Sequence, residues 1–130
     1  MPTSTSFAAL SGHEFMNLTT YRKSGEAMVT PVWFAQDGDT LYVMTSKDAG
    51  KVKRIRNTAR VQIGPSDRSG KPLGPVELAQ GRVLAGQEAK KADELLSKKY
   101  GLMKKMFDLA GSLRGGRDFL AITQAPEVQE

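Results

Sequence analysis

The stretch AMVTPVWFAQDGDTLYVMTS, residues 27–46, decides the fold. Its first part, residues 27–36, is rich in β-branched and aromatic side chains and predicts a strand, DGD predicts a tight turn, and TLYVMTS, residues 40–46, predicts a second strand. The preceding stretch FMNLTTYR, residues 15–22, has the same character and ends at the Gly-containing turn KSGE. These three predicted strands therefore follow one another as an antiparallel meander.

Pro31 lies inside the strand predicted over residues 27–36. Proline cannot donate a hydrogen bond to a β-ladder, so it is confined to edges and bulges of a sheet. We expect this segment to be an edge, a bulge, or a place where something other than a strand lies alongside. Pro31 is thus the first indication of a binding site.

The rest of the chain predicts three more strands and further helices. RVQIGP (residues 60–65) and PVELAQGRVLA (residues 75–85) read as strands, separated by the surface loop SDRSGKPLG, and RDFLAIT (residues 117–123) reads as the last strand. Apolar residues at three- and four-residue steps predict a helix from residue 88 to about 110, which Gly101 would split, and a short helix is expected around residues 7–10. The pattern predicts a mainly β (α+β) fold, a six-stranded antiparallel barrel with flanking helices, as a single domain over residues 1–130.

Composition narrows the classes of function. Cysteine is absent and His13 is the one histidine, so disulfides and Cys or His metal clusters are excluded. No apolar run approaches the roughly 20 residues of a membrane-spanning helix, and the N-terminal residues do not read as a signal peptide, so we expect a soluble cytoplasmic protein. The net charge of +5 and a sequence pI of about 9.6 predict attraction to anionic ligands or polyanions.

The stretch TSKDAGKVKRIRN, residues 45–57, carries five basic side chains and one aspartate directly after a predicted strand. It predicts a short helix with Asp48 as its N-cap. The ordinary interpretation is a solvated helix face, which we expect for Arg54 and Arg56. However, Lys47 and Lys51 flank the helix N-terminus, where cations are disfavoured by about 0.3–1 kcal/mol. An anion bound at this point would relieve that repulsion.

Phosphate is the anion that these residues suit best. Backbone N–H groups at a helix start, nearby ammonium groups, and the hydroxyls of Thr45 and Ser46 together form a phosphate-binding arrangement. Neither the P-loop pattern G-x-x-x-x-G-K-[ST] nor G-x-G-x-x-G occurs, so a nucleoside triphosphatase or a Rossmann dehydrogenase is poorly supported.

Nucleic-acid binding is the alternative, since small barrels bind single strands with basic grooves and stacking aromatics. Aromatic residues are present in the predicted strands, but apart from Tyr21, beside Arg22 and Lys23, these strands carry few basic residues and no RNP-like pattern. No nucleic-acid partner is therefore expected, although a basic binding module remains the third hypothesis.

Residues 18–84 resemble the flavin/deazaflavin oxidoreductases of the pyridoxamine-phosphate-oxidase-like FMN-binding split β-barrel superfamily, and more narrowly their coenzyme F420-dependent members. The motifs TPVWF, DGDTLYV and GKVKRIRN carry this resemblance in combination. It implies a homodimer whose cofactor lies in a groove at the subunit interface. FMN-binding oxidases of the superfamily begin the second strand with an Arg that binds phosphate, whereas this chain has AMVTP there. That departure favours F420 over FMN, and the oligoglutamate tail of F420 would suit a basic groove.

The resemblance also implies cofactor-binding residues. The ring system would be met by Thr30, Pro31, Val32 and Trp33. The phosphate region would be held by Thr45, Ser46, Gly50, Lys51 and Lys53. Because Trp33 and Phe34 point to opposite faces of their strand, one can be core while the other borders the groove; Trp33 suits a core or dimer-interface position equally.

The implied activity is transfer of a hydride from the reduced deazaflavin to a conjugated small-molecule acceptor such as an enone or quinone. The hydride chemistry of such enzymes belongs to the cofactor, so no catalytic residue is assigned. His13 suits a surface or packing role better than that of a proton donor. An FMN-binding oxidoreductase or flavin carrier is the alternative function.

Overall fold

The computed structural model describes residues 10, 12–46, 50–100 and 117–124. Six strands and two helices lie in these ranges, in the order β1 (Phe15–Tyr21), β2 (Ala27–Asp37), β3 (Thr40–Ser46), α1 (Gly50–Asn57), β4 (Arg60–Ser66), β5 (Glu77–Val83), α2 (Gly86–Tyr100) and β6 (Arg117–Gln124). Three expectations fall outside the described residues: the N-cap Asp48, the helix break at Gly101 and, except for residue 10, the helix around residues 7–10.

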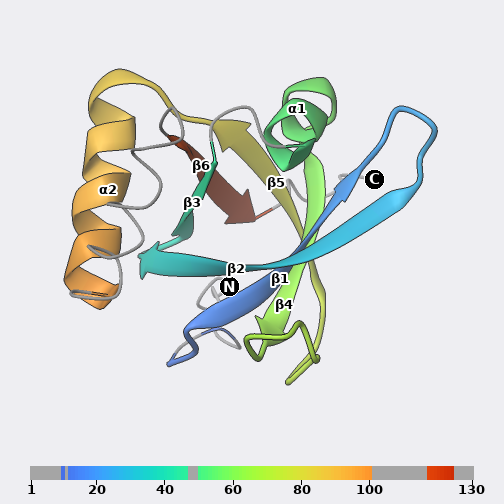
Figure 1. Cartoon of the computed structure of the whole chain (residues 1–130), viewed down its shortest axis with the longest axis horizontal. Coiled ribbons are helices and arrows are strands. Elements are labelled where there is room, and N and C mark those ends of the chain that lie inside the picture. The colour runs from blue at the N-terminus through green and yellow to red at the C-terminus, as the bar shows by residue number, and fades with distance from the viewer. Residues whose placement is uncertain (1–9, 11, 47–49, 101–116, 125–130) are drawn as a thin grey trace, which may run out of the picture.

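The strands form a closed antiparallel barrel in the order β1-β2-β3-β6-β5-β4 (Figure 1). The meander predicted for the first three strands is confirmed. The last strand, β6, pairs with β3 on one side and with β5 on the other, and β4 pairs with β1. Closure gives each strand two neighbours over part of its length, which leaves few unpaired edges. The six-stranded barrel predicted from the sequence is therefore confirmed.

The interior of the barrel follows from the alternation of side chains along its strands. In β1 the residues alternate strictly, with Met16, Leu18 and Thr20 buried and their neighbours half-buried. The same alternation in the other strands supplies the remaining core residues, which include Phe34, Leu41, Val43, Val61, Ile63, Leu120 and Ile122.

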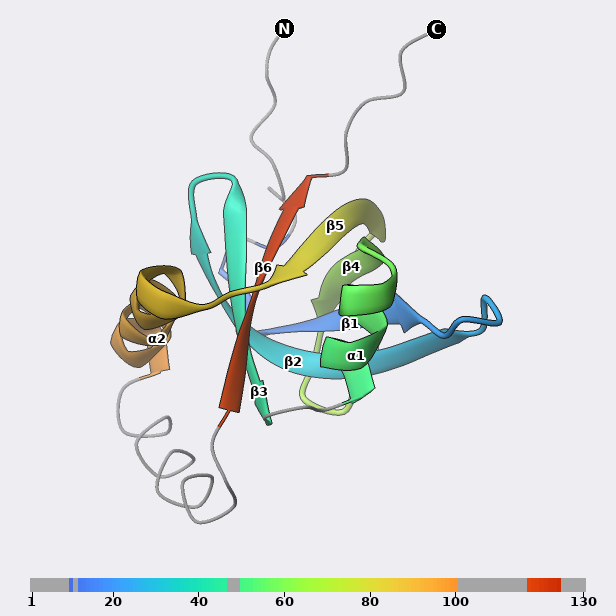
Figure 2. The ribbon, with the colours of Figure 1, turned by 90° about the horizontal axis from the view of Figure 1, so that it is seen from above.

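The two helices cover different parts of the barrel (Figure 2). Helix α1 lies against β1 and β5 and inserts Val52 and Ile55 into the barrel core. Helix α2 lies against β2, β3 and β6, where Ala92 and Leu96 pack on the outer side of the sheet. Each helix thus buries one apolar stripe, and α1 is fixed close to the end of β3.

The element boundaries differ from the prediction at a few points. Strand β5 is shorter than residues 75–85, because Pro75 has no N–H for the ladder and Gly86, at φ +60°, already begins α2. The helix expected from residue 88 begins at Gly86 and is described to Tyr100. No helix in the described ranges has the length and apolar composition to cross a membrane.

Candidate functional site

Strands β2 and β3 separate part of the way along their length. Their pairing runs from Asp37–Thr40 to Phe34–Val43 and ends there. Beyond that point residues 27–33 of β2 continue to pair with β1, and residues 44–46 of β3 continue to pair with β6. Pro31 lies in this one-sided part of β2, so the expectation that no strand lies along one side of it is confirmed. The two diverging edges leave backbone groups that a ligand can reach.

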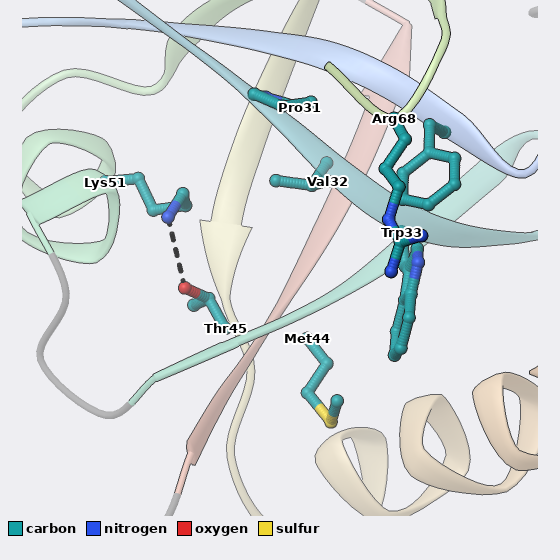
Figure 3. Close-up of a pocket in the computed structure, with 8 residues that line it drawn as sticks. Pro31, Val32, Trp33, Met44, Thr45, Lys51 and Arg68 are labelled. Carbon is teal, nitrogen blue, oxygen red and sulfur yellow. Dashed lines mark hydrogen bonds between the residues drawn. The ribbon is translucent and has the colours of Figure 1, made fainter. Parts of the chain in front are cut away.

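A cleft of about 360 Å³ lies where the two strands diverge (Figure 3). It is lined by Phe15, Pro31, Val32, Trp33, Met44, Thr45, Lys51 and Arg68. Lys51 with Thr45 lies at one end and Arg68 with Trp33 at the other, with Val32 between them. The described lining holds two cations and no carboxylate, so the cleft favours an anionic ligand with an apolar middle portion.

Lys51 reaches into the cleft from the first turn of α1. Its Nζ donates a hydrogen bond to Thr45 Oγ1 at 3.2 Å, and the Thr45 side chain is buried. Burial lowers the pKa of Lys51 from its ordinary value of 10.5, and the neighbouring charge of Arg54 lowers this pKa further. An anion bound beside Lys51 would offset both effects, which makes this end of the cleft the candidate phosphate site.

The expectation that Arg54 lies on a solvated helix face is wrong. It is half-buried, and its Nε donates a 2.6 Å hydrogen bond to the hydroxyl of Thr20, a buried residue of β1. A Cβ atom on Gly50 would lie 2.7 Å from Nη1 of Arg54. The absence of a side chain at Gly50 therefore lets the guanidinium pack against the start of α1. Arg56 is exposed, as expected.

The aromatic pair Trp33–Phe34 lies as the alternation of a strand predicts. Phe34 is 1% exposed and belongs to the barrel core. Trp33 faces the other way, lines the cleft, and packs partly against the cluster of Ala35, Met44 and Leu96 beneath α2. Its ring lies 6.3 Å from that of Phe15, at an interplanar angle of 50°. The two aromatics form one wall of the cleft.

The structure brings together five of the nine predicted cofactor-binding residues. Pro31, Val32, Trp33, Thr45 and Lys51 line the cleft. Thr30 and Gly50 neighbour lining residues in the chain without lining the cleft themselves, and the side chain of Ser46 lies outside the described atoms. Lys53 is exposed and lines a separate depression of about 300 Å³ with Tyr21, Arg22, Lys23, Arg54 and Asn57. The cofactor-binding roles of all nine residues remain predictions.

Three lining residues were not predicted. Phe15 lies directly opposite Trp33 in the register of β1 with β2, and Met44 immediately precedes Thr45. Arg68 comes from the loop between β4 and β5, which is far from the other lining residues in the sequence. Strand alternation could have identified Met44, but the placement of Phe15 and Arg68 depends on pairing register and on the path of a loop.

The loop that carries Arg68 is held by its own hydrogen bonds. Oδ1 of Asp67 accepts bonds from the Ser69 amide at 2.9 Å, the Ser69 hydroxyl at 2.7 Å and the Lys71 amide at 2.9 Å. These bonds, the Ser69 hydroxyl first, lower the pKa of Asp67. Asn17 of β1 also donates from Nδ2 to the carbonyl of Gly70 at 2.8 Å. The loop is thereby fixed beside the cleft, and Arg68 lies next to its Asp67 cap.

Comparison with known families and structures gives one family match. The sequence profile of the family described as Pyridoxamine 5'-phosphate oxidase matches residues 4–126, which is nearly the whole chain. No curated protein matches this sequence.

Several solved structures share the fold at low sequence identity. A protein related to general stress protein 26 of B. subtilis (pyridoxinephosphate oxidase family), from Clostridium acetobutylicum, has a TM-score of 0.66 and 14% identity, over 89% of this chain and 78% of that one. An FAD-binding protein from Mesorhizobium loti has a TM-score of 0.64 and 16% identity, over 91% and 84%. The heme storage protein HutZ from Vibrio cholerae has a TM-score of 0.64 and 15% identity, also over 91% and 84%. At these identities the similarity concerns the fold alone.

Proposed function

Because this chain belongs to the pyridoxamine 5'-phosphate oxidase family, we propose that the cleft between β2 and β3 binds a phosphorylated flavin or deazaflavin and that the protein is an oxidoreductase. The observation that carries the proposal is the position of the Lys51–Thr45 pair at one end of a cleft that Pro31, Val32 and Trp33 also line. In this arrangement Lys51 and Thr45 hold the phosphate, while Pro31, Val32 and Trp33 contact the ring system.

The residues present fit such a cofactor in three respects. The cavity volume of about 360 Å³ lies in the usual range for a small-molecule site. The diverging edges of β2 and β3 offer backbone donors and acceptors to the polar edge of a ring. The cation at the Lys51 end is partly desolvated, so it gains more from a phosphate than a fully hydrated lysine would.

We propose F420 as the cofactor, with FMN as the alternative. Strand β2 begins with Ala27 and Met28, where FMN-binding relatives carry an arginine. Basic side chains continue beyond Lys51 into the neighbouring depression lined by Lys53 and Arg54. Such a surface suits an anionic tail that extends out of the cleft, as the oligoglutamate of F420 would.

The protein's part in the reaction would be binding and orientation. A bound deazaflavin supplies the hydride that reduces a conjugated acceptor of the enone or quinone type. Lys51 and Thr45 would hold the phosphate end, and Pro31 with Val32 would contact the ring. Trp33 and Phe15 would form one wall of the cofactor's site. No side chain is assigned a proton transfer, and a cytoplasmic location remains part of the proposal.

A homodimer is the assembly that the surface of the barrel supports. Four neighbouring strands each place one residue directly opposite the next: Val29 of β2, Thr19 of β1, Gln62 of β4 and Leu78 of β5. Val29 and Leu78 are 55% and 60% exposed, and nearby Val76 is 63% exposed. We call these three residues the outer apolar face. Because Pro31 follows Val29 on the same side of β2, a subunit bound on this face would lie beside the cleft.

The Leu78→Glu variant should weaken this dimer. A carboxylate in the middle of an apolar interface loses its hydration without gaining a partner. We expect the wild type to sediment as a dimer in analytical ultracentrifugation and Leu78→Glu to shift toward monomer. Gln87→Glu adds the same charge on exposed α2 and should leave the dimer intact. A wild type that stays monomeric at high micromolar concentration would contradict the proposed assembly.

Cofactor titration tests the proposed function directly. Trp33 is the one tryptophan of the chain and lines the cleft, so a cofactor that enters should quench its fluorescence. We expect saturable quenching by F420 at micromolar concentrations and weaker quenching by FMN. Absence of binding by both would remove the enzyme hypothesis. A Soret band in the absorbance spectrum of the purified protein would indicate heme instead, and retained nucleic acid with steep salt dependence would indicate a basic binding module.

A further inference from the structure

Arg68 lines two cavities at once. One is the cleft between β2 and β3, and the other is an adjoining depression of about 700 Å³. The lining of the depression comes from the segment before β1 and from the loop after β4: Gly12, His13, Glu14, Phe15, Ser66, Asp67, Arg68 and Leu73. Phe15 and Arg68 line both cavities, so the depression adjoins the Trp33 end of the cleft.

The charge of Arg68 is available to a ligand. Its guanidinium makes no hydrogen bond or ion pair with the described residues. The adjacent carboxylate of Asp67 accepts three bonds from Ser69 and Lys71 within its own loop. Asp67 therefore fixes the loop and does not form an ion pair with Arg68. The bonds of Asp67 hold the backbone of the loop, while the side chain of Arg68 is exposed and lines both cavities.

Arg68 and Lys51 lie at opposite ends of the cleft (Figure 3). A phosphate held by Lys51 and Thr45 leaves Arg68 beside the far end of the ring, where the second depression opens. The cleft is the smaller of the two cavities and suits one ring system, whereas the depression has room for a second molecule. Arg68 is thus placed to contact the molecule bound next to the cofactor.

We propose that Arg68 is a specificity-determining residue that binds the carboxylate of a conjugated acceptor occupying the second depression. The planar guanidinium matches a carboxylate through two parallel hydrogen bonds. Glu14 and Asp67 also line the depression and repel any anion there, a dianion such as phosphate more strongly than a singly charged carboxylate, so the carboxylate has to contact Arg68 directly. This inference deepens the proposed function by naming the acceptor class, and it rests on that function for the acceptor's role.

The experiment compares two probes of similar shape, cinnamate and cinnamamide, by isothermal titration calorimetry on the full chain without added cofactor. We expect the wild type to bind cinnamate about ten-fold or more tightly than the neutral amide, the usual gain from a charge-assisted bidentate contact. Arg68→Ala should bind cinnamate and cinnamamide with similar affinities. Arg68→Gln, which keeps most of the side-chain length but loses the charge, should show the same loss of preference. Lys71→Ala removes a cation from the same loop outside both cavities and should keep the preference.

Two outcomes would overturn the inference. The first is an unchanged preference for cinnamate in Arg68→Ala, or no preference in the wild type. The second is a loss of F420 or FMN affinity in Arg68→Ala as large as the loss of cinnamate affinity, which would assign Arg68 to the cofactor. If the wild type binds neither cofactor but keeps the carboxylate preference, the proposed function fails and the Arg68 site stands.

Discussion

The Lys51→Ala variant should bind the phosphorylated cofactor about 1–3 kcal/mol more weakly than the wild type, the range for losing a charge-assisted hydrogen bond. The physical reason is the position of Nζ, half-buried and directed at Thr45 Oγ1, where it would donate a charge-assisted hydrogen bond to the phosphate. Quenching of Trp33 fluorescence by F420 and by FMN measures the change in both affinities. Equal affinity in the variant would place the phosphate elsewhere.

The same substitution should leave the melting temperature nearly unchanged. Folding lowers the pKa of Lys51 below 10.5, which means that its charged form is less favourable in the folded protein than in the unfolded chain. In the free protein this lysine therefore costs stability at a pH below the lowered pKa, and the cost shrinks as the pH rises from that value to 10.5, where the unfolded chain also loses the proton. A large fall in melting temperature would show that Lys51 is a structural residue.

The pH dependence of binding provides a second measurement. Because the pKa of Lys51 is lowered, its ammonium begins to lose its proton at a lower pH than a free lysine. The affinity difference between the wild type and Lys51→Ala should therefore shrink as the pH approaches 10.5. Lys53→Ala is the matched control from the same helix: Lys53 lines the separate depression, so its loss should affect only a tail that extends there.

The strands could be predicted from the sequence because each combines β-branched or aromatic residues with a clear turn at its ends. The boundaries of β3 agree with the expected residues 40–46, and those of β1 and β2 differ by one residue. Local chemistry explains this success, since Gly25 and Gly38 adopt φ of +96° and +61° at the two hairpin turns. The ends of β1, β2 and β3 depend on residues that are adjacent in the chain, so they can be predicted from the sequence.

The cleft could be predicted only in part. Pro31 marked the place where β2 lacks a second partner strand, and Lys51 marked the helix start beside it. Phe15 and Arg68 are brought there by the pairing register of β1 and by a loop fixed through Asn17 and Gly70, neither of which leaves a local pattern. Arg54 was misjudged because a helical wheel does not reveal that a buried threonine of another strand lies within reach.

The Phe34→Ala variant should lose about 3–5 kcal/mol of stability, which is the cost of deleting a buried aromatic side chain and leaving a cavity. Phe34 is among the largest fully buried side chains, and it is the last residue of β2 that pairs with β3 before the strands diverge. Its ring also lies 3.9 Å below Nζ of Lys99, which donates a 2.8 Å hydrogen bond to the Phe34 carbonyl. Urea denaturation followed by far-UV circular dichroism measures the loss.

Trp33→Phe is the comparison for Phe34→Ala, because it changes the neighbouring aromatic on the opposite side of the same strand. Trp33 borders the cleft and is only partly buried, so we expect a cost of about 1 kcal/mol. Cofactor affinity should be reduced more by Trp33→Phe than by Phe34→Ala once the folded fractions are corrected for, since Trp33 would contact the ring and Phe34 would not. Isothermal titration calorimetry measures it, because Trp33→Phe removes the one tryptophan. If Trp33→Phe destabilised the barrel as much as Phe34→Ala, both aromatics would be core residues and the wall of the cleft would have to be assigned to Phe15 and Met44.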